Sequence, residues 1–233
     1  MKSFLVLLHV LLGLIMCSDL VRAQQSFTMS GRKIDVNPQG IVYISGEDGT
    51  RLADFSIGFF TPTWRLHTNV KTVDMKKDDK ADDNKMVVSG KIPQHDASLP
   101  AANFKQTVTW KEETAAIEYE FELPAGLELM PKTKPFVLIE IPMDAIKGRD
   151  VLLGAKTFKI PAHNSYGWGN SMVINGIGLD LSLDRKVAMS SWGKDGIDKK
   201  ASFRIDMEPV ASDTGKNNAY KIVMTFCFKN KGE

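Results

Sequence analysis

Ile117-Glu118-Tyr119-Glu120-Phe121-Glu122-Leu123 alternates apolar and acidic side chains without a break. Since successive side chains of a β-strand point to opposite faces, this stretch predicts a strand with one apolar and one ionic face. About ten segments of the chain alternate in this way, and none shows a long stretch of helical periodicity. An antiparallel sheet with one buried face produces that pattern. The sequence therefore predicts an all-β fold.

Turn residues divide the chain into strands of this kind. Asn37-Pro38-Gln39-Gly40, for example, separates residues 33–36 from residues 41–45, which we expect to pair. Further strands are predicted over residues 53–60, 66–75, 86–92, 104–111, 117–123, 136–141, 157–160, 171–174, 178–184, 187–191, 203–207 and 222–228, with one helical turn at residues 144–147. Two packed layers bury many alternating faces, so we predict a two-layer antiparallel β-sandwich, of supersandwich or jelly-roll type, with little helix.

The first 23 residues have the pattern of a secretory signal peptide. Lys2 supplies the positive start, residues 4–16 the apolar stretch, and Val21-Arg22-Ala23 the small residues of a cleavage site. We expect cleavage after Ala23, which leaves residues 24–233 as one domain without a transmembrane segment, secreted or held in the periplasm or at the cell surface. Lipid attachment at Cys17 is disfavoured, because Met16 occupies the place where a lipobox has Gly, Ala or Ser.

Charge and cysteine content argue against nucleic acid as a partner and against an internal disulfide. Without the leader the chain carries 28 basic and 27 acidic side chains, so it has no excess of positive charge for nucleic acid. Cys227 is then the single cysteine, which excludes an internal disulfide. We predict that the core alone stabilises the domain and that it uses no cofactor.

The chain contains no recognisable reaction motif: it lacks a Gly-x-Ser-x-Gly elbow, a His-Glu-x-x-His pair and a phosphate-cradling glycine loop. Glu118, Glu120 and Glu122 stand about 7 Å apart on one strand face, a spacing compatible with the paired carboxyls of a glycosidase. A solvated sheet face shows the same row, and we interpret the row in that way. His67 and His95 belong to no motif.

Two groups of aspartates could offer oxygen ligands to calcium. Residues 76–85 hold four aspartates, but interleaved lysines cancel their potential, so we interpret this segment as a mobile, solvated hairpin tip. Asp180 and Asp184, which flank Ser182 on one predicted strand face, are a weaker second candidate. We therefore predict no metal site.

An aromatic stretch offers the best candidate for a binding site. Tyr166-Gly167-Trp168-Gly169 stands between two asparagines in a predicted loop, where the glycines free the backbone to present a flat ring. A sugar's C–H face stacks on such a ring while nearby amides bond its hydroxyls. Two further tryptophans stand at predicted strand ends, whereas Trp110 continues a core face. The predicted ligand-binding residues are Trp168, Tyr166, Trp64, Asn164, Asn170, His163 and Trp192. The alternative for each loop tryptophan is a plug that closes the end of the sandwich.

Three stretches carry a resemblance to a known kind of module. They are Asp48-Gly49 followed by residues 55–60 and Pro62-Thr63-Trp64, then Phe-x-Gln-x-Val at residues 104–108, then the strand and Ile-Pro-x-Asp-x-x-x-Gly at residues 139–148. Their order resembles the large β-sandwich modules, of the galactose-mutarotase-like supersandwich kind, in secreted bacterial carbohydrate-active proteins. The resemblance spans residues 26–230 and implies a carbohydrate-associated role. Mutarotases use a glutamate base and a histidine acid, but no glutamate here matches by motif, and His163-Asn164-Ser165-Tyr166 is only loosely similar to their histidine neighbourhood.

The sequence therefore favours an exported, non-catalytic β-sandwich that binds a polysaccharide or oligosaccharide. One alternative is a mutarotase-like epimerase or lyase, which requires a histidine and a carboxylate that converge on an open sheet face. The other is an envelope structural or protein-interaction domain, which requires exposed edge strands or an apolar patch.

Overall fold

The computed structural model describes residues 25–77, 84–146, 148–159, 165–192, 202–208, 210–211 and 218–228. In these residues the chain is almost entirely β-structure, with one helical turn, α2 (Met143–Ile146), and one 3-10 turn, η1 (Asn69–Lys71). All of the strand pairings recorded among them are antiparallel. The all-β prediction is confirmed, and the predicted leader lies outside the described residues.

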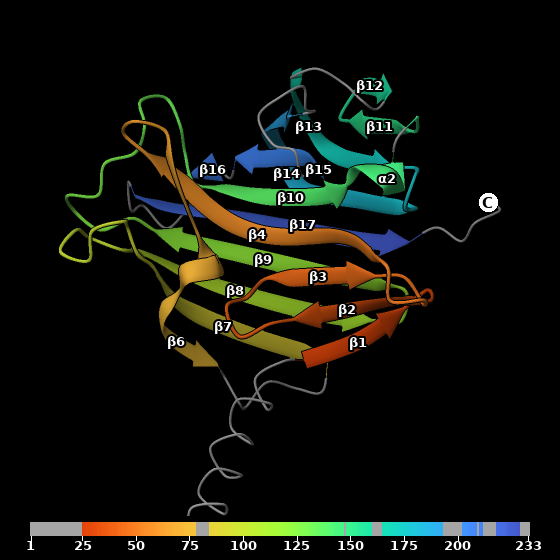
Figure 1. Cartoon of the computed structure of the whole chain (residues 1–233), viewed down its shortest axis with the longest axis horizontal. Helices are drawn as coiled ribbons and strands as arrows, with labels where there is room; N and C mark the ends of the chain where they lie inside the picture. Colours follow the sequence, from red (N-terminus) through yellow and green to blue (C-terminus); the bar gives the residue numbers. More distant parts are fainter. Residues whose placement is uncertain are drawn as a thin grey trace, which may run out of the picture.

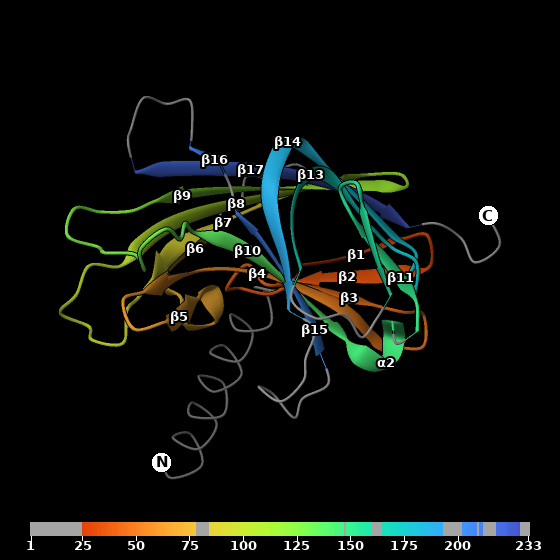
Figure 2. The ribbon, with the colours of Figure 1, turned by 90° about the horizontal axis from the view of Figure 1, so that it is seen from above.

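Two layers of sheet lie face to face (Figures 1 and 2). The first layer has the order β1-β2-β3-β4-β10-β15, with β5 beside the C-terminal end of β4. Its strands are β1 (Gln25–Met29), β2 (Arg32–Val36), β3 (Val42–Ser45), β4 (Arg51–Thr61), β5 (Arg65–Thr68), β10 (Phe136–Pro142) and β15 (Ser202–Glu208).

The second layer has the order β6-β7-β8-β9-β17, and β16 pairs with the start of β17. Its strands are β6 (Val73–Lys77), β7 (Lys85–Ile92), β8 (Ala102–Lys111), β9 (Thr114–Glu122), β16 (Val210–Ala211) and β17 (Ala219–Phe228). In Figure 1, β2, β3 and β4 of the first layer lie in front of β8 and β9.

Two long strands, β13 (Ser165–Ile174) and β14 (Leu179–Trp192), join the layers at one edge. The first part of β14 pairs with β17, and its last part, residues 188–192, pairs with β15 in the other layer. Beside β13, two short strands, β11 (Asp150–Leu153) and β12 (Lys156–Lys159), extend the sheet. Such a continuous sheet that folds over itself is the two-layer sandwich that the alternation predicts.

The core is formed by the inward side chains of both layers. On β9, Ile117 and Tyr119 are buried while the glutamates between them point outward. Phe55 of β4 meets Phe226 of β17 edge to face, with ring centroids 5.7 Å apart, so the two layers interlock through aromatic contact. Trp110 stacks on a phenylalanine of β1 and packs against this core, as predicted.

The predicted strand over residues 66–75 is wrong, because η1 divides it into β5 and β6. Asn69 causes the break. Its fully buried side chain accepts a hydrogen bond from the Ile57 amide (3.1 Å) and donates one to the Gln39 carbonyl (2.8 Å). The asparagine amide thus bonds the main chain of β4 and of the β2–β3 turn at the point where a continuing strand would have paired. The chain then crosses to the second layer and continues there as β6.

The aromatic stretch that we predicted to be a loop is part of a strand instead. Residues 165–169 belong to β13 and pair with residues 187–191 of β14. The two glycines and Asn170 suggest a loop by type, yet a partner strand satisfies the backbone here. In the same way, residues 178–184 and 187–191 form one strand, and β1, β11 and β16 were not predicted.

Candidate functional site

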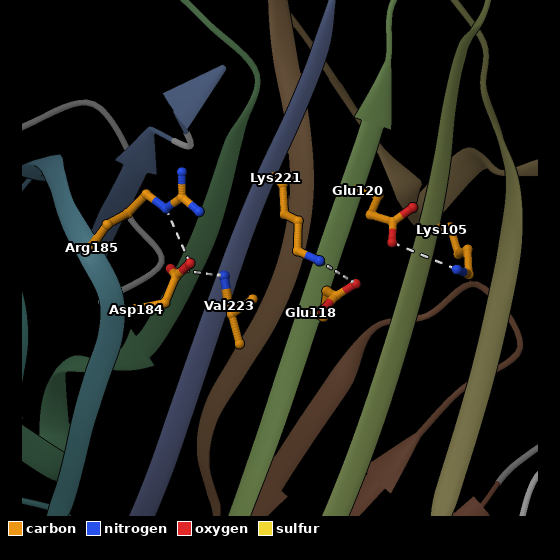
Figure 3. A network of polar contacts seen from close by, with 7 residues as sticks. All are labelled: Lys105, Glu118, Glu120, Asp184, Arg185, Lys221 and Val223. Atoms are coloured by element: carbon orange, nitrogen blue, oxygen red, sulfur yellow. Dashed lines mark hydrogen bonds and ion pairs between the residues drawn. The ribbon is translucent and has the colours of Figure 1, made fainter. Parts of the chain in front are cut away.

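The candidate site begins with the polar side of the second layer, here called the outer sheet face. It consists of side chains that alternate with core residues on β8, β9, β17 and β14: Lys105, Glu118, Glu120, Lys221, Val223 and Asp184 (Figure 3). On β9 these are two of the three glutamates that the sequence predicted to share a solvated face. The structure confirms that they point away from the core.

Cross-strand register places an opposite charge beside each glutamate. Lys105 and Lys221 lie directly opposite Glu120 on its two flanking strands. Lys221 Nζ is 2.9 Å from Glu118 Oε1, and Lys105 Nζ is 3.6 Å from Glu120 Oε1. Sequence reasoning missed these lysines as site residues, although both occupy the polar positions of their alternating strands. The row is thus a ladder of ion pairs.

The ion pairs keep both partners charged. Burial raises the pKa of Glu118, but the hydrogen bond that Lys221 donates and the positive charges of Lys221 and Lys105 outweigh it, so the net shift of the pKa is downward. The hydrogen bond to Glu118 in turn raises the pKa of Lys221. A general acid needs the opposite, a carboxyl whose pKa is raised toward neutrality. Glu118 is therefore suited to hydrogen bonding and electrostatics rather than to proton donation.

At the edge of the outer sheet face, β14 bends from one layer to the other. Gly169 pairs with Val187 and Ser171 with Ser182, so residues 183–186 of β14 lie opposite the single residue Asn170. Asp184 accepts hydrogen bonds there from Arg185 Nε (3.1 Å) and from the Val223 amide (3.4 Å). A bulge of this kind terminates regular pairing and re-aims side chains.

Trp168 stands two residues from that bulge, on β13, with 57% of its surface exposed. Asn170 is exposed as well. Gly154, between β11 and β12, packs on the Trp168 backbone, and a Cβ built at Gly154 would lie 2.9 Å from the Trp168 carbonyl oxygen. The indole is therefore presented by two neighbouring strands and a close-packed turn, which is a firmer support than the predicted loop.

The other predicted site residues are placed as follows. Tyr166 lies in β13 and Trp192 ends β14, but neither side chain is described. His163 and Asn164 lie outside the described residues. Trp64 belongs to the turn between β4 and β5, a part of the molecule well away from β13 in Figures 1 and 2. The structure thus brings Trp168 and Asn170 together and separates Trp64 from them.

Trp64 has its own surroundings. It is 59% exposed, and its ring meets Phe60 edge to face at 5.5 Å between centroids. Thr63 and Trp64 have φ angles of 72° and 59°, both in the left-handed region that non-glycine residues seldom occupy. The turn therefore holds the indole outward at a cost in backbone strain.

The histidines lie near this turn. His67 is 8% exposed, its Nε2 is 3.1 Å from Thr61 Oγ1, and its ring centroid is 6.1 Å from that of His95. Burial, with the charge of His95, lowers the pKa of His67 and so favours its neutral imidazole. Within the described chain, these histidines contact each other rather than the glutamates of the outer sheet face.

The described residues hold neither a cluster of metal ligands nor a helix that could cross a membrane. The described residues include no group of three or more histidine, cysteine, aspartate or glutamate side chains placed to hold a metal ion. The predicted hairpin tip of four aspartates lies largely outside them. Asp184, the second aspartate candidate, is engaged with Arg185. Over the same residues, the helices are too short and too polar to cross a bilayer.

Comparisons with known proteins bear on the fold. No protein-family model matches the chain, and no curated protein does. Among solved structures, the chain is similar to a 4-alpha-glucanotransferase from Thermococcus litoralis (10% identity, TM-score 0.53), over 88% of this chain and 39% of that one. It is also similar to a putative aldose 1-epimerase from Escherichia coli K12 (9% identity, TM-score 0.48), over 89% of this chain and 99% of that one. A third similar structure is an alpha-mannosidase from Enterococcus faecalis V583 (9% identity, TM-score 0.48), over 88% of this chain and 29% of that one.

The Thermococcus likeness supports the predicted two-layer β-sandwich at the level of the fold. This chain spans 39% of the length of that protein. At 10% identity the shared fold leaves the function to be argued from the residues of the site.

Proposed function

We propose that this chain is a non-catalytic carbohydrate-binding domain in which a glycan stacks on Trp168. One observation carries the proposal: an indole 57% exposed, on a bulged strand rather than on a loop, with an exposed asparagine two residues away. A ring on paired strands keeps its orientation, and stacking needs little induced ordering. The amide of Asn170 offers both a donor and an acceptor for sugar hydroxyls.

The outer sheet face supports a ligand that extends beyond the ring. Asp184 and Arg185 lie opposite Asn170, and the lysine–glutamate ladder continues from there across β17, β9 and β8 (Figure 3). Charged side chains already held by cross-strand partners lose little further freedom on binding. A glycan chain that crosses the strands would find alternating donors and acceptors along its length.

The neighbours that act on sugars do not carry this proposal. The Thermococcus protein is described as a glucanotransferase, but the likeness is one of fold. The enzymatic alternative, a mutarotase-like epimerase or lyase, requires a histidine beside a carboxylate. Of the histidines in the described residues, His67 and His95 face each other, and the carboxylate that interacts with His95 is the exposed Asp96 next to it in sequence. The glutamates of the ladder are bonded to lysines instead.

A protein-interaction role has its own supporting observation. Five of the seven large apolar side chains exposed in the described chain lie between Trp64 and Met75, along edge strands β5 and β6. Exposed apolar groups that gather in one region mark interaction surfaces. The segment is thus a candidate contact surface for another protein, separate from Trp168.

Export is the remaining part of the proposal. Residues 1–23 have the composition of a signal peptide, and Ala23 stands at a cleavage position. N-terminal sequencing of the protein recovered from outside the cytoplasm should begin at Gln24. A first residue of Met1 in the exported fraction would contradict cleavage.

Affinity electrophoresis tests the carbohydrate proposal. The protein is run through native gels that contain single soluble polysaccharides, beside Trp168→Ala and the matched control Trp64→Ala. We expect at least one polysaccharide to retard the parent and the control but not Trp168→Ala. Equal migration of all three proteins in every gel would reject the proposal, provided that circular dichroism shows the variants folded.

A further inference from the structure

A second feature of the molecule lies at the opposite end from the β4–β5 turn, where four connections converge. In Figure 1 the β1–β2 turn, the β3–β4 turn and α2 all lie at the right-hand end of the sandwich. Together with the β13–β14 turn they enclose a cleft of about 970 Å³, here called the end cleft. That volume falls in the range of small-molecule sites. Its walls come from segments more than a hundred residues apart in sequence.

Close contacts at glycines, with a side chain at Gly31 and with backbone at Gly176, hold the walls of the end cleft. Gly31, with φ +67°, has the Glu47 carboxylate against it, so close that a Cβ would lie 2.3 Å from Oε1. A Cβ on Gly176 would lie 2.6 Å from the Ala145 carbonyl oxygen, which shows how tightly the β13–β14 turn packs on α2. The β3–β4 turn is closed by the Gly49 amide, which donates to the Gly46 carbonyl at 3.0 Å. The cleft is therefore preformed.

Three charged side chains of the lining have no charged partner. They are Arg32, Glu47 and Asp144. Within the described chain, none of these side chains forms an ion pair or a side-chain hydrogen bond. By contrast, two other lining residues are engaged, since Arg51 is bonded to Asp54 and Asp48 bonds the Thr50 amide and hydroxyl. Unpaired groups of both signs that face one cleft are available to a ligand.

Arg32 is the most informative of the three. Its guanidinium carbon lies 5.8 Å from the centroid of the Phe228 ring, which holds the side chain in place. Its Nε is buried, yet no hydrogen-bond acceptor reaches it. A buried donor without an acceptor costs free energy and calls for a partner. Beside these polar groups, Leu52, Pro142 and Ile177 give the cleft an apolar wall.

We propose that the end cleft is a separate binding site for a small sugar, of one or two rings. Each sugar hydroxyl both donates and accepts, so one ligand can donate to Glu47 and Asp144 and accept from Arg32. Two unpaired carboxylates against one unpaired guanidinium give a local excess of negative charge. Among sugars of equal size, the site therefore prefers an amino sugar to a neutral one and disfavours a uronic acid. This site is independent of the glycan surface proposed at Trp168.

Three hexoses that differ in charge test this proposal. Isotope-labelled protein is titrated with D-glucosamine, D-glucose and D-glucuronate, and the amide signals of Gly31, Gly46 and Gly176 are followed by NMR. We expect saturable shifts of these signals, tightest for glucosamine and weakest for glucuronate. Arg32→Ala should weaken glucose binding about tenfold, as expected for the loss of a charged hydrogen bond. Lys33→Ala, next on the same strand and paired with Asp35, is the matched control.

A second variant keeps the test decisive if Arg32→Ala fails to fold. Glu47→Gln removes one carboxylate charge. It should lower the ratio of the affinity for glucosamine to the affinity for glucuronate about fivefold. The absence of saturable shifts with all three sugars would overturn the proposal, and so would tightest binding of glucuronate or shifts unaltered by both variants. Trp168→Ala should leave the glycine shifts unchanged and Arg32→Ala should leave polysaccharide retardation unchanged, so the two proposals fail separately.

Discussion

Trp64 and Trp168 are exposed to nearly the same extent, 59% and 57%, but their surroundings differ. Trp64 projects from a strained turn, rests on Phe60, and is followed by exposed aliphatic side chains. Trp168 lies on a paired strand next to Asn170 and the bend of β14. The comparison teaches that the exposure of a tryptophan does not by itself define a sugar-binding site. Hydrogen-bonding groups beside the ring separate a glycan site from an apolar contact surface.

The two regions also differ in what holds them. The segment that carries Trp64 pairs with β4 through β5, and the buried Asn69 side chain anchors its far end to β4 and to the β2–β3 turn. Trp168 depends on main-chain pairing and on the close approach of Gly154. Each support can be removed separately, and the expected effects are ordered below by size.

The largest effect is expected from Asn69→Ala. The substitution leaves the Ile57 amide and the Gln39 carbonyl without partners, so we expect a loss of about 3 kcal/mol in the free energy of unfolding. Denaturant titration measures it, with Asn170→Ala as the exposed control on the other side of the comparison. A loss below about 1 kcal/mol for Asn69→Ala would mean that the segment has another anchor.

The next effect concerns the support of Trp168. Gly154→Ala places a Cβ at a left-handed φ of 58° and 2.9 Å from the Trp168 carbonyl oxygen. We therefore expect a loss of about 2 kcal/mol in the free energy of unfolding and a shift in tryptophan fluorescence emission. Gly49→Ala is the matched control, since Gly49 has φ 80° but no atom within 4 Å of the added Cβ. Equal losses in both variants would show that the contact with Trp168 contributes nothing.

A smaller effect, of opposite sign, should appear at Trp64. Thr63→Gly relieves a β-branched residue held at φ 72°, so we expect a gain of about 1 kcal/mol in stability. Thermal unfolding of this variant and of the parent measures the gain. A destabilised variant would indicate that contacts of the threonine side chain outweigh the strain.

The smallest effect is expected in the ion-pair ladder. Lys221→Met should cost less than about 1 kcal/mol at pH 7, because exposed ion pairs contribute little. The lowered pKa of Glu118 means that its contribution is present above the pKa of the unfolded carboxyl and is lost as pH falls through the folded value. The difference between parent and variant should therefore shrink as pH falls below the ordinary pKa of a glutamate and vanish once Glu118 is protonated in the folded protein. A difference that does not change with pH would assign it to packing.

Much of this fold could be predicted because alternation is local. The row Glu118, Glu120 and Glu122 faces outward as expected, and the run from Phe136 to Ile141 is buried between neighbouring strands except at Glu140. The break at Asn69 could not be predicted, because its cause is a contact with residues 12 and 30 positions away. The same holds for β13, where glycines that suggest a loop are paired to a strand.

The candidate site could be predicted only in part. Trp168 and Asn170 were identified by residue type and both are exposed. Their separation from Trp64 is a matter of topology, because the β4–β5 turn and β13 belong to different parts of the sandwich. The lysine partners of the glutamates follow from strand register, which pairs β9 with β8 and, across about a hundred residues of sequence, with β17.

The most direct test of the account is calorimetric titration of the polysaccharide that retards the parent most strongly in native gels into three proteins: the parent, Trp168→Ala and Trp64→Ala. We predict that Trp64→Ala binds like the parent, whereas Trp168→Ala loses at least about 1.4 kcal/mol, a tenfold drop in affinity. Loss of binding in Trp64→Ala with full binding in Trp168→Ala would contradict the account and move the glycan site to the β4–β5 turn.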